Sequence, residues 1–354
     1  MQKKKILIFY QSVAEITEIL KILSKNPFGS CVIIITGGKH FVPVIKKLKL
    51  EKKFGVIVHS FYALSLKNPL NILAIYFKFY FSNNTKKILN YYYEEAIFFN
   101  KFFDFITPFF LYKIKVKKIS HIDFYKFKFS KKAINIGLKN ILKKFIIKIL
   151  YGNLRIKIFF YKLIFQGSIV FYFHLPNIKK KNKTKEKINY YAPLLSMDYK
   201  LNKKKKVIYL DSNEEDYLVS MGESSVGKKI GKTAVEVLKF FESKGYNIVI
   251  KKHSRANISP SLLKIKNWTY IIDSLPIEFY NLNKYDFVVG YSSTGLALVF
   301  QKNPRINVVS IIKLIPSNFI KYENAHKYYN YIANTNKIYY PENLDQVKNL
   351  LVKN

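Results

Sequence analysis

The sequence predicts an α/β protein with two doubly wound domains, and three observations predict it. Short apolar runs alternate with longer amphipathic stretches in both halves, which is the pattern of parallel strands joined by helices. A polar stretch rich in Lys and Asn, residues 177–206, is typical of a linker. The length of 354 residues suffices for two cores. We therefore expect an N-terminal domain over residues 1–195 and a C-terminal domain over residues 203–354, facing each other across a cleft.

The first half contains six apolar runs that predict strands. A helix is expected at residues 15–23, and the aromatic, Lys-containing stretches 70–81, 97–113 and 141–165 also predict helices. The expected strands are residues 6–10, 31–36, 55–59, 88–93, 118–122 and 168–173.

The second half repeats this alternation. Gly245 stops a predicted helix over residues 232–244. Because ligands bind at the carboxyl ends of parallel strands, the residues that directly follow each strand are the candidate site. The expected strands are residues 207–210, 247–250, 269–272, 286–289 and 306–309, with further helices at 277–282, from 292, and at 341–353.

The net charge of +39 implies an anionic partner. Nucleic acid is not the expected partner, because the sequence has no zinc-finger spacing or RNP-like motif and has few arginines, the commonest readers of bases. The single cysteine, Cys31, excludes a disulfide framework, and no two histidines are spaced as paired ligands. No metal and no cofactor are therefore expected.

The N-terminal apolar run, residues 6–10, is too short for a signal peptide and predicts a first strand. No stretch has the roughly 18 uninterrupted apolar residues of a membrane span. We expect a cytoplasmic protein that lies peripherally on the anionic inner face of the membrane. The aromatic, Lys-containing stretches are either helices that lie on that surface or ordinary core helices with solvated lysines.

Three strand-end elements carry possible chemistry. Lys252, His253 and Ser254 follow the strand at 247–250, and a histidine there can contact a phosphate or protonate a leaving group. An ordinary surface histidine beside lysines is the plainer alternative.

The second element is Pro276-Ile277-Glu278, and the third is Ser292-Ser293-Thr294. Glu278 accepts hydrogen bonds from a nucleotide or stabilises a helix N-terminus. The hydroxyls and N–H groups of the third element suit a phosphate, or one serine caps the helix.

In this order the three elements resemble the donor domains of the bacterial lipooligosaccharide sialyltransferases and capsular polysialyltransferases, which are GT-B glycosyltransferases. Those domains carry a K-x-H-P strand end, a P-x-E helix start and an S-S/T turn after a strand, and the resemblance covers roughly residues 205–310. Ser254 stands where the family has Pro, which loosens the turn.

The resemblance implies a role for each matching residue. His253 would support departure of CMP, Glu278 would bind the cytidine, and Ser292 and Ser293 would bind the phosphate. The loop after the first strand of this domain, Asp211-Ser212-Asn213, would face the donor.

The general base is less well defined, because the acidic pair before Gly that the family uses does not occur in this chain. Asp123, at the end of the strand at 118–122, suits the family order and is favoured. Glu95, in the pair that follows the strand at 88–93, is the alternative. A third possibility is that neither residue is catalytic.

The stretch Gly222 to Lys229 is close to a P-loop, but Lys229 replaces the Ser or Thr that would hold magnesium. Gly231-Lys232-Thr233 has the right ending, but Val226 stands where the first Gly is required. We interpret this stretch as a flexible loop before the helix at 232–244.

The resemblance implies metal-independent, inverting transfer of sialic acid or a related nonulosonate from a CMP donor to a lipooligosaccharide or capsular glycan. Two alternatives stay open. One is a CDP-glycerol-type glycerophosphotransferase that builds a teichoic-acid-like polymer. The other is a non-catalytic binding protein on a degenerate transferase scaffold.

Overall fold

The structure is a computed structural model, and the chain divides into two units. The N-terminal unit comprises Met1–Leu163 with Ile169–Tyr191, and the C-terminal unit comprises Ala192–Asn354 with Ile164–Ser168. The described residues are 4–12, 15–25, 30–37, 41–61, 69–99, 106–122, 142, 145, 157–162, 169–174, 179–181, 205–214, 224–254, 256–303, 305–315, 326, 329 and 337–352.

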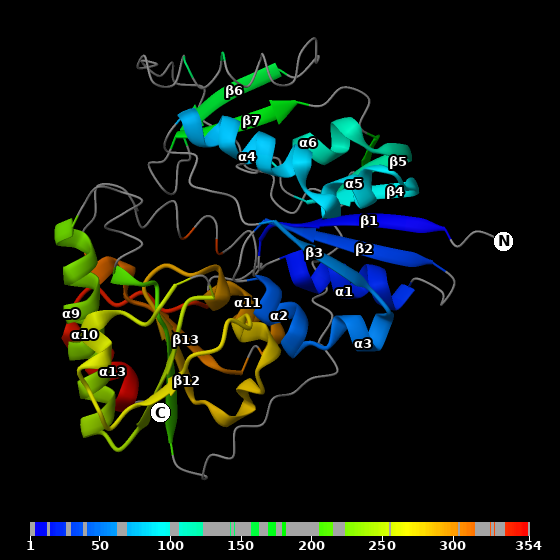
Figure 1. Cartoon of the computed structure of the whole chain (residues 1–354). Coiled ribbons are helices and arrows are strands. Elements are labelled where there is room, and N and C mark those ends of the chain that lie inside the picture. Colours follow the sequence, from blue (N-terminus) through cyan, green and yellow to red (C-terminus); the bar gives the residue numbers. More distant parts are fainter. Residues whose placement is uncertain are drawn as a thin grey trace. The chain divides into compact units, whose positions relative to one another are not determined.

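The N-terminal unit is built on a parallel sheet in the order β3-β2-β1-β4-β5-β8. In Figure 1, α1 and α3 lie on one side of β1 and β2, while α4 and α6 lie on the other. The strands are β1 (Lys5–Tyr10), β2 (Cys31–Thr36), β3 (Ile57–Ser60), β4 (Tyr92–Phe98), β5 (Lys115–Ile122) and β8 (Lys179–Lys181). The helices are α1 (Ile16–Lys25), α2 (Phe41–Lys47), α3 (Leu50–Phe54), α4 (Pro69–Phe81), α5 (Asn83–Leu89) and α6 (Ile106–Lys113).

The core of this unit explains why its central strands are continuous apolar runs. Leu7 and Phe9 of β1 and Ile33 and Ile35 of β2 are buried in one cluster with Phe109 of α6. A parallel sheet covered by helices on both faces needs apolar side chains in both directions along each strand.

A separate antiparallel pair, β6 (Lys157–Lys162) and β7 (Ile169–His174), lies outside this sheet. The strand predicted at 168–173 is therefore confirmed. The helix predicted over 141–165 is wrong at residues 157–162, which form β6. Residues 158–161 are a continuous run of apolar and aromatic residues, and such a short run does not distinguish a strand from part of a helix.

The C-terminal unit is built on a second parallel sheet in the order β11-β10-β9-β12-β13. Figure 1 shows α9, α10 and α13 beside one another, and α9 contacts both of the others. The strands are β9 (Lys206–Leu210), β10 (Asn247–Lys251), β11 (Thr269–Ile271), β12 (Phe287–Gly290) and β13 (Asn307–Ser310). The helical segments are α9 (Ser224–Ser243), α10 (Pro260–Leu263), η2 (Ile277–Phe279), η3 (Leu282–Lys284), α11 (Thr294–Lys302), η4 (Ile311–Leu314) and α13 (Leu344–Val352).

The predicted fold class is confirmed, because the chain has two doubly wound, Rossmann-like parallel sheets, one in each unit. In each unit the chain runs outward from the first strand, crosses back and continues on the other side. Right-handed crossovers then place the later helices on the opposite face of the sheet. The predicted helix stop at Gly245 is also confirmed, since this residue has a φ of 83°, which favours glycine.

The helix predicted over 97–113 is also wrong at residues 97–98, which end β4. Three further local expectations are wrong. Residues 88–93 are not one strand, because α5 ends at Leu89 and β4 begins at Tyr92. Residues 224–231 belong to α9 and are not a loop. Lys179–Lys181, which we expected in the linker, form the edge strand β8 beside β5. Lysines on an edge strand discourage pairing with another chain, so the charged composition fits that position.

Candidate functional site

The strand ends of the C-terminal sheet lie level with one another. Leu210 of β9 is in register with Lys251 of β10 and with Gly290 of β12, and Gly290 is in register with Ser310 of β13. The chain leaves β9 toward α9 on one face and leaves β12 toward α11 on the other. The adjacent ends of β9 and β12 are therefore a topological switch point, where ligands bind in open α/β sheets.

Gly295 brings the Pro-x-Glu and Ser-Ser-Thr elements together. A Cβ at Gly295, in the first turn of α11, would lie 2.9 Å from Cγ2 of Ile277 and 3.1 Å from Cδ1 of Leu210. Only glycine permits η2 to pack this closely against α11. Glu278 in η2 is 4% exposed and lies in this packed segment, and Pro276 directly precedes it.

The serines after β12 have distinct partners. Ser293 is the N-cap of α11, and its side chain accepts a hydrogen bond from the Gly295 N–H at 3.2 Å. The Ser292 hydroxyl accepts one from the hydroxyl of Tyr329 at 3.3 Å, and Thr294 is the first residue of the helix. The capping interpretation is thus confirmed for Ser293.

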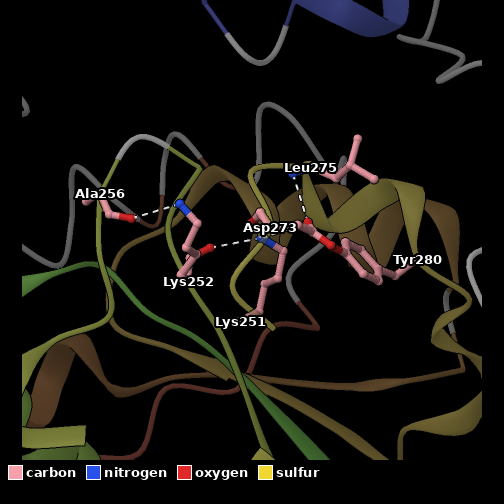
Figure 2. A network of polar contacts seen from close by, with 6 residues as sticks. All are labelled: Lys251, Lys252, Ala256, Asp273, Leu275 and Tyr280. Carbon is pink, nitrogen blue, oxygen red and sulfur yellow. Dashed lines mark hydrogen bonds and ion pairs between the residues drawn. The ribbon is translucent and has the colours of Figure 1, made fainter. Parts of the chain in front are cut away.

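A buried lysine ties the end of β10 to Asp273, which in turn contacts Leu275 and Tyr280, the residues that flank the segment 276–279, as Figure 2 shows. Lys251 is 3% exposed, and its Nζ donates to the carbonyl oxygens of Asp273 at 2.8 Å and of Lys252 at 3.0 Å. Oδ1 of Asp273 lies 3.9 Å from the same Nζ and accepts the Leu275 N–H at 3.0 Å and the hydroxyl of Tyr280. The Lys-Lys-His element and the Pro-x-Glu element are therefore held in one network.

The residues that directly follow β10 adjoin this network. The Lys252 N–H donates to the carbonyl of Ile271, and its Nζ donates to the carbonyl of Ala256 at 3.2 Å. Burial lowers the pKa of Lys252, and the nearby Asp273 carboxylate partly opposes this. His253 and Ser254 follow and are half-buried. The carboxyl end of β10 is therefore followed by Lys252, a lysine of lowered pKa, and by His253.

The loop after β9 is joined by hydrogen bonds to the segment that follows His253. Asp211 is 3% exposed, and its carboxylate accepts the Ser259 N–H at 2.7 Å, the Ser259 hydroxyl at 2.7 Å and the Asn213 N–H at 3.0 Å. Asn213 has a φ of 58° and donates from Nδ2 to the carbonyl of Asn257 at 2.9 Å. Both side chains therefore hold the 257–259 segment, which follows His253. The expectation that this loop faces the donor stays a prediction.

Burial raises the pKa of Asp211, and the carboxylate of Glu214 raises it further, while the hydrogen bonds from Ser259 and Asn213 lower it. Ser212, between Asp211 and Asn213, is 9% exposed. Its Oγ is buried and has no hydrogen-bond partner among the described residues. A buried hydroxyl in this state is costly to retain, so Ser212 is the member of this loop best placed for a ligand.

The P-loop-like stretch has a packing role. A Cβ at Gly227 would lie 2.5 Å from the carbonyl oxygen of Glu214, and one at Gly231 would lie 1.8 Å from Oε1 of Glu214. These two glycines, one turn apart on α9, give the helix a face that admits Glu214. Glu214 in turn donates its N–H to the Ser259 hydroxyl and accepts the Ser261 N–H at 3.2 Å. Both glycines therefore allow Glu214 to hold the segment at Ser259 and Ser261, which follows His253.

The candidate bases belong to the N-terminal unit. Asp123 lies outside the described residues, and β5 ends at the preceding residue, Ile122. Glu95 lies in the middle of β4, where it accepts hydrogen bonds from Lys118 at 2.9 Å and from the Ser120 hydroxyl. Its expected position after a strand is wrong. These cross-strand contacts give Glu95 a structural role within the sheet.

A further carboxylate lies at the carboxyl edge of β1 and was missed by the sequence analysis. Glu15 is 2% exposed, and its Oε2 accepts the Gln11 N–H at 2.7 Å. Glu15 directly precedes α1, which begins at Ile16, and its contact with the end of β1 has no signal in the local sequence.

The sequence analysis also missed Asp273, Tyr280, Ser259 and Tyr329. Asp273 follows β11, and its position after a strand is a usable signal. Ser259 and Tyr329 have no local signal, because their partners Asp211 and Ser292 lie far away in the sequence.

A groove of about 680 Å³ opens at the other end of the C-terminal sheet. Its lining includes Lys205, Phe287 and Asn307, which lie at the amino ends of β9, β12 and β13. Ligand sites of doubly wound sheets lie at the carboxyl ends, so this groove is not the candidate donor site.

The described part of the chain contains no group of three or more His, Cys, Asp or Glu side chains able to hold a metal ion. None of its helices has both the length and the apolar content to cross a membrane.

No protein-family model matches the chain, and no curated protein matches its sequence. Similar solved structures include a UDP complex of S. aureus MnaA, with a TM-score of 0.45, 11% identity, and coverage of 99% of this chain and 97% of that chain. The glycotransferase of kitacinnamycin has a TM-score of 0.45, 8% identity, and coverage of 100% and 91%. The wall teichoic acid polymerase TagF has a TM-score of 0.38, 11% identity, and coverage of 98% and 81%. At these TM-scores and identities the likeness carries no information on donor or acceptor.

Proposed function

We propose that the chain is an inverting glycosyltransferase that moves sialic acid or a related nonulosonate from a CMP donor to a lipooligosaccharide or capsular glycan. One observation carries the proposal. The His253 loop, the Pro276–Glu278 segment and the Ser292–Thr294 turn share the carboxyl edge of one sheet, at its topological switch point. These are the elements by which the sequence resembles the sialyltransferase donor domains.

The proposed reaction is a single displacement at the anomeric carbon. The acceptor oxygen forms a bond to that carbon as the bond to the CMP phosphate oxygen breaks, and the acceptor proton passes to a carboxylate. His253, Lys252 and the N-terminal turn of α11 stabilise the negative charge on the leaving phosphate. Glu278 binds the cytidine, and no metal is required when cationic and helix-terminal groups neutralise the phosphate.

Asp123 is the proposed base, because it directly follows the end of β5 in the N-terminal sheet. Glu95 is less well suited, since Lys118 and Ser120 occupy its carboxylate in the middle of β4. Glu15 is a third carboxylate to test, because it is buried at the carboxyl edge of β1.

Two other functions make different predictions for the same site. A CDP-glycerol-type glycerophosphotransferase would use the same histidine and hydroxyl elements with a diphosphate donor. A binding protein on a transferase scaffold would bind a cytidine nucleotide without turnover. Release of CMP from CMP-sialic acid, with and without a glycan acceptor, separates these functions from the proposed one.

The decisive experiment is a calorimetric titration of the full chain with CMP, UMP and CDP-glycerol. We expect CMP to bind in preference to UMP, and His253→Ala to weaken CMP binding about 10- to 100-fold, the range for loss of a hydrogen bond to a charged group. His59→Ala, in the N-terminal unit, is the matched control and should leave CMP binding unchanged.

Failure of every cytidine nucleotide to bind would contradict the proposal and leave only the fold. Preferential binding of CDP-glycerol would favour the phosphotransferase. If CMP binds, the variants Asp123→Asn, Glu95→Gln and Glu15→Gln identify the base, which is the one whose loss abolishes turnover while CMP affinity persists.

A further inference from the structure

Helix α4 exposes aromatic side chains on a face that is ordinarily polar. Phe77, Tyr80 and Phe81 are 53%, 48% and 66% exposed, and we name these three residues the α4 aromatic patch. The exposed positions Ala74, Phe77, Lys78 and Phe81 recur at i, i+3, i+4 and i+7, so they share one face of the helix. A surface helix of a water-soluble domain has polar residues at these positions, so the face calls for a covering partner.

The rings of the patch form one continuous cluster. Phe77 and Phe81 stack with centroids 6.5 Å apart, and Tyr80 meets Phe81 edge-on at 5.4 Å. Tyr80 also stacks on Tyr76 at 6.1 Å, and Tyr76 packs against the buried Phe109 of α6 at 5.6 Å. The exposed rings are therefore supported by the core and present a preformed surface.

The surroundings of the patch are cationic. The Lys113 ammonium lies 5.5 Å from the centre of the Tyr80 ring. No Asp or Glu occurs from residue 52 to residue 93, which includes all of α4 and α5. The exposed lysines of these helices and of the end of α6 are Lys78, Lys86, Lys87 and Lys113.

We propose that the α4 aromatic patch and its lysines bind the surface of an anionic lipid bilayer. Aromatic rings settle at the level of the lipid headgroups, with an apolar body toward the acyl chains, and lysines beside them attract anionic headgroups. The thirteen residues of α4 allow it to lie in the interface and are too few to cross the bilayer.

A second copy of the chain fits this surface less well. In a two-fold symmetric dimer the same patch meets itself, so the lysines around it would face the same lysines with no carboxylate from α4 or α5 to neutralise them. An anionic bilayer supplies the missing negative charge.

Cosedimentation of the full chain with vesicles tests this inference. One set contains phosphatidylcholine alone, and in the other phosphatidylglycerol replaces about a third of it. We expect binding to the anionic set, and a loss of about 10- to 100-fold in the double variant Phe77→Ser, Phe81→Ser, from the apolar area removed. Lys86→Glu with Lys87→Glu should weaken binding to the anionic vesicles without changing the rings.

Leu263→Ser is the matched control, because Leu263 is 54% exposed but lies in α10 of the C-terminal unit, and it should bind like the unaltered chain. Equal binding to both vesicle sets, or no effect of the Phe77 and Phe81 substitutions, would overturn the inference. So would a dimer in light scattering that the double variant dissociates. The result is independent of CMP binding, so this inference and the proposed function can fail separately.

Discussion

Replacing Gly227 by Ala tests whether the glycines of α9 serve packing or phosphate binding. In an open helical position this change stabilises a protein by about 1 kcal/mol. Here the new Cβ would lie 2.5 Å from the carbonyl oxygen of Glu214 and 3.3 Å from its carbonyl carbon. The Glu214 backbone cannot retreat easily, because its N–H is bonded to the hydroxyl of Ser259.

The size of the effect follows from these distances. A contact of 3.0 Å is the least that Cβ atoms show, so α9 or Glu214 must move by about 0.5 Å. Overpacking of a well-packed site costs about 1–3 kcal/mol, and the gain in helix propensity returns about 1 kcal/mol. We therefore expect a net loss of about 1 kcal/mol, opposite in sign to the ordinary effect.

The fluorescence of Trp268 is the assay, since it is the only tryptophan of the chain. Trp268 is 4% exposed, and its Nε1 donates to Oε1 of Glu242 on α9 at 3.1 Å, so it reports the packing of that helix. We expect the midpoint of thermal unfolding to fall by about 2–4 °C for Gly227→Ala. Lys228→Ala, at an exposed position of the same turn, should stay within about 0.5 kcal/mol of the unaltered chain.

A Gly227→Ala variant that is more stable than the unaltered chain would refute the packing role. A variant of unchanged stability that no longer binds CMP would assign the glycine to the ligand and revive the P-loop interpretation.

Two further predictions concern the network at the end of β10. Lys251→Met leaves the half-buried Asp273 carboxylate without its ion pair and removes the Lys251 donor from two carbonyls, so unfolding followed by Trp268 fluorescence should show a loss of about 3 kcal/mol. An unchanged stability would contradict the network. Because burial lowers the pKa of Lys252, a fraction of the molecules has a neutral Lys252 side chain at alkaline pH. A bound phosphate favours the charged form of this side chain. CMP binding should therefore take up protons at alkaline pH, as calorimetry in two buffers measures, and an equal uptake in Lys252→Met would contradict the assignment.

The strands of the fold could largely be predicted, because a covered parallel sheet needs apolar runs such as Cys31–Thr36. The run at 88–93 misled the analysis for an identifiable reason. Its apolar residues belong to two elements that pack on each other, since the Tyr93 hydroxyl donates to the carbonyl of Ile88 at 2.9 Å. Glu95 looked like the end of a strand, but Lys118 lies opposite it on β5. Cross-strand partners of this kind have no signal in the local sequence.

The start of α9 could not be predicted for a related reason. Gly and Ser have low helix propensity, so residues 224–231 have the composition of a loop. The structure requires glycine at 227 and 231 because Glu214 lies against the helix there. A tertiary contact therefore explains two glycines that, from the local sequence alone, indicate a flexible loop.

The position of the site could be predicted from the sequence. Which of its residues hold neighbouring loops could not. The sequence order of the three elements is a consequence of the parallel sheet, which brings the ends of β10 and β12 to one edge. Asp211 and Asn213 follow β9 at the same edge, yet their partners Ser259 and Asn257 are more than forty residues away in the chain. Sequence position places such residues near a ligand, and only the fold shows that they hold a neighbouring loop.

Some residues at this sheet edge hold neighbouring loops, which leaves fewer candidates for ligand contacts in the C-terminal unit. The side chains of Asp211 and Lys251 each make at least two hydrogen bonds to neighbouring loops. Such groups determine the position of the site but not the ligand that it binds. Ser212 differs, because its buried hydroxyl has no partner within the described residues although it lies beside the switch point. A buried polar group without a partner is costly, and a ligand that bonds to it removes that cost. Ser212, after β9, and His253, after the adjacent strand β10, are therefore the residues whose substitution best separates loss of the ligand from loss of the fold.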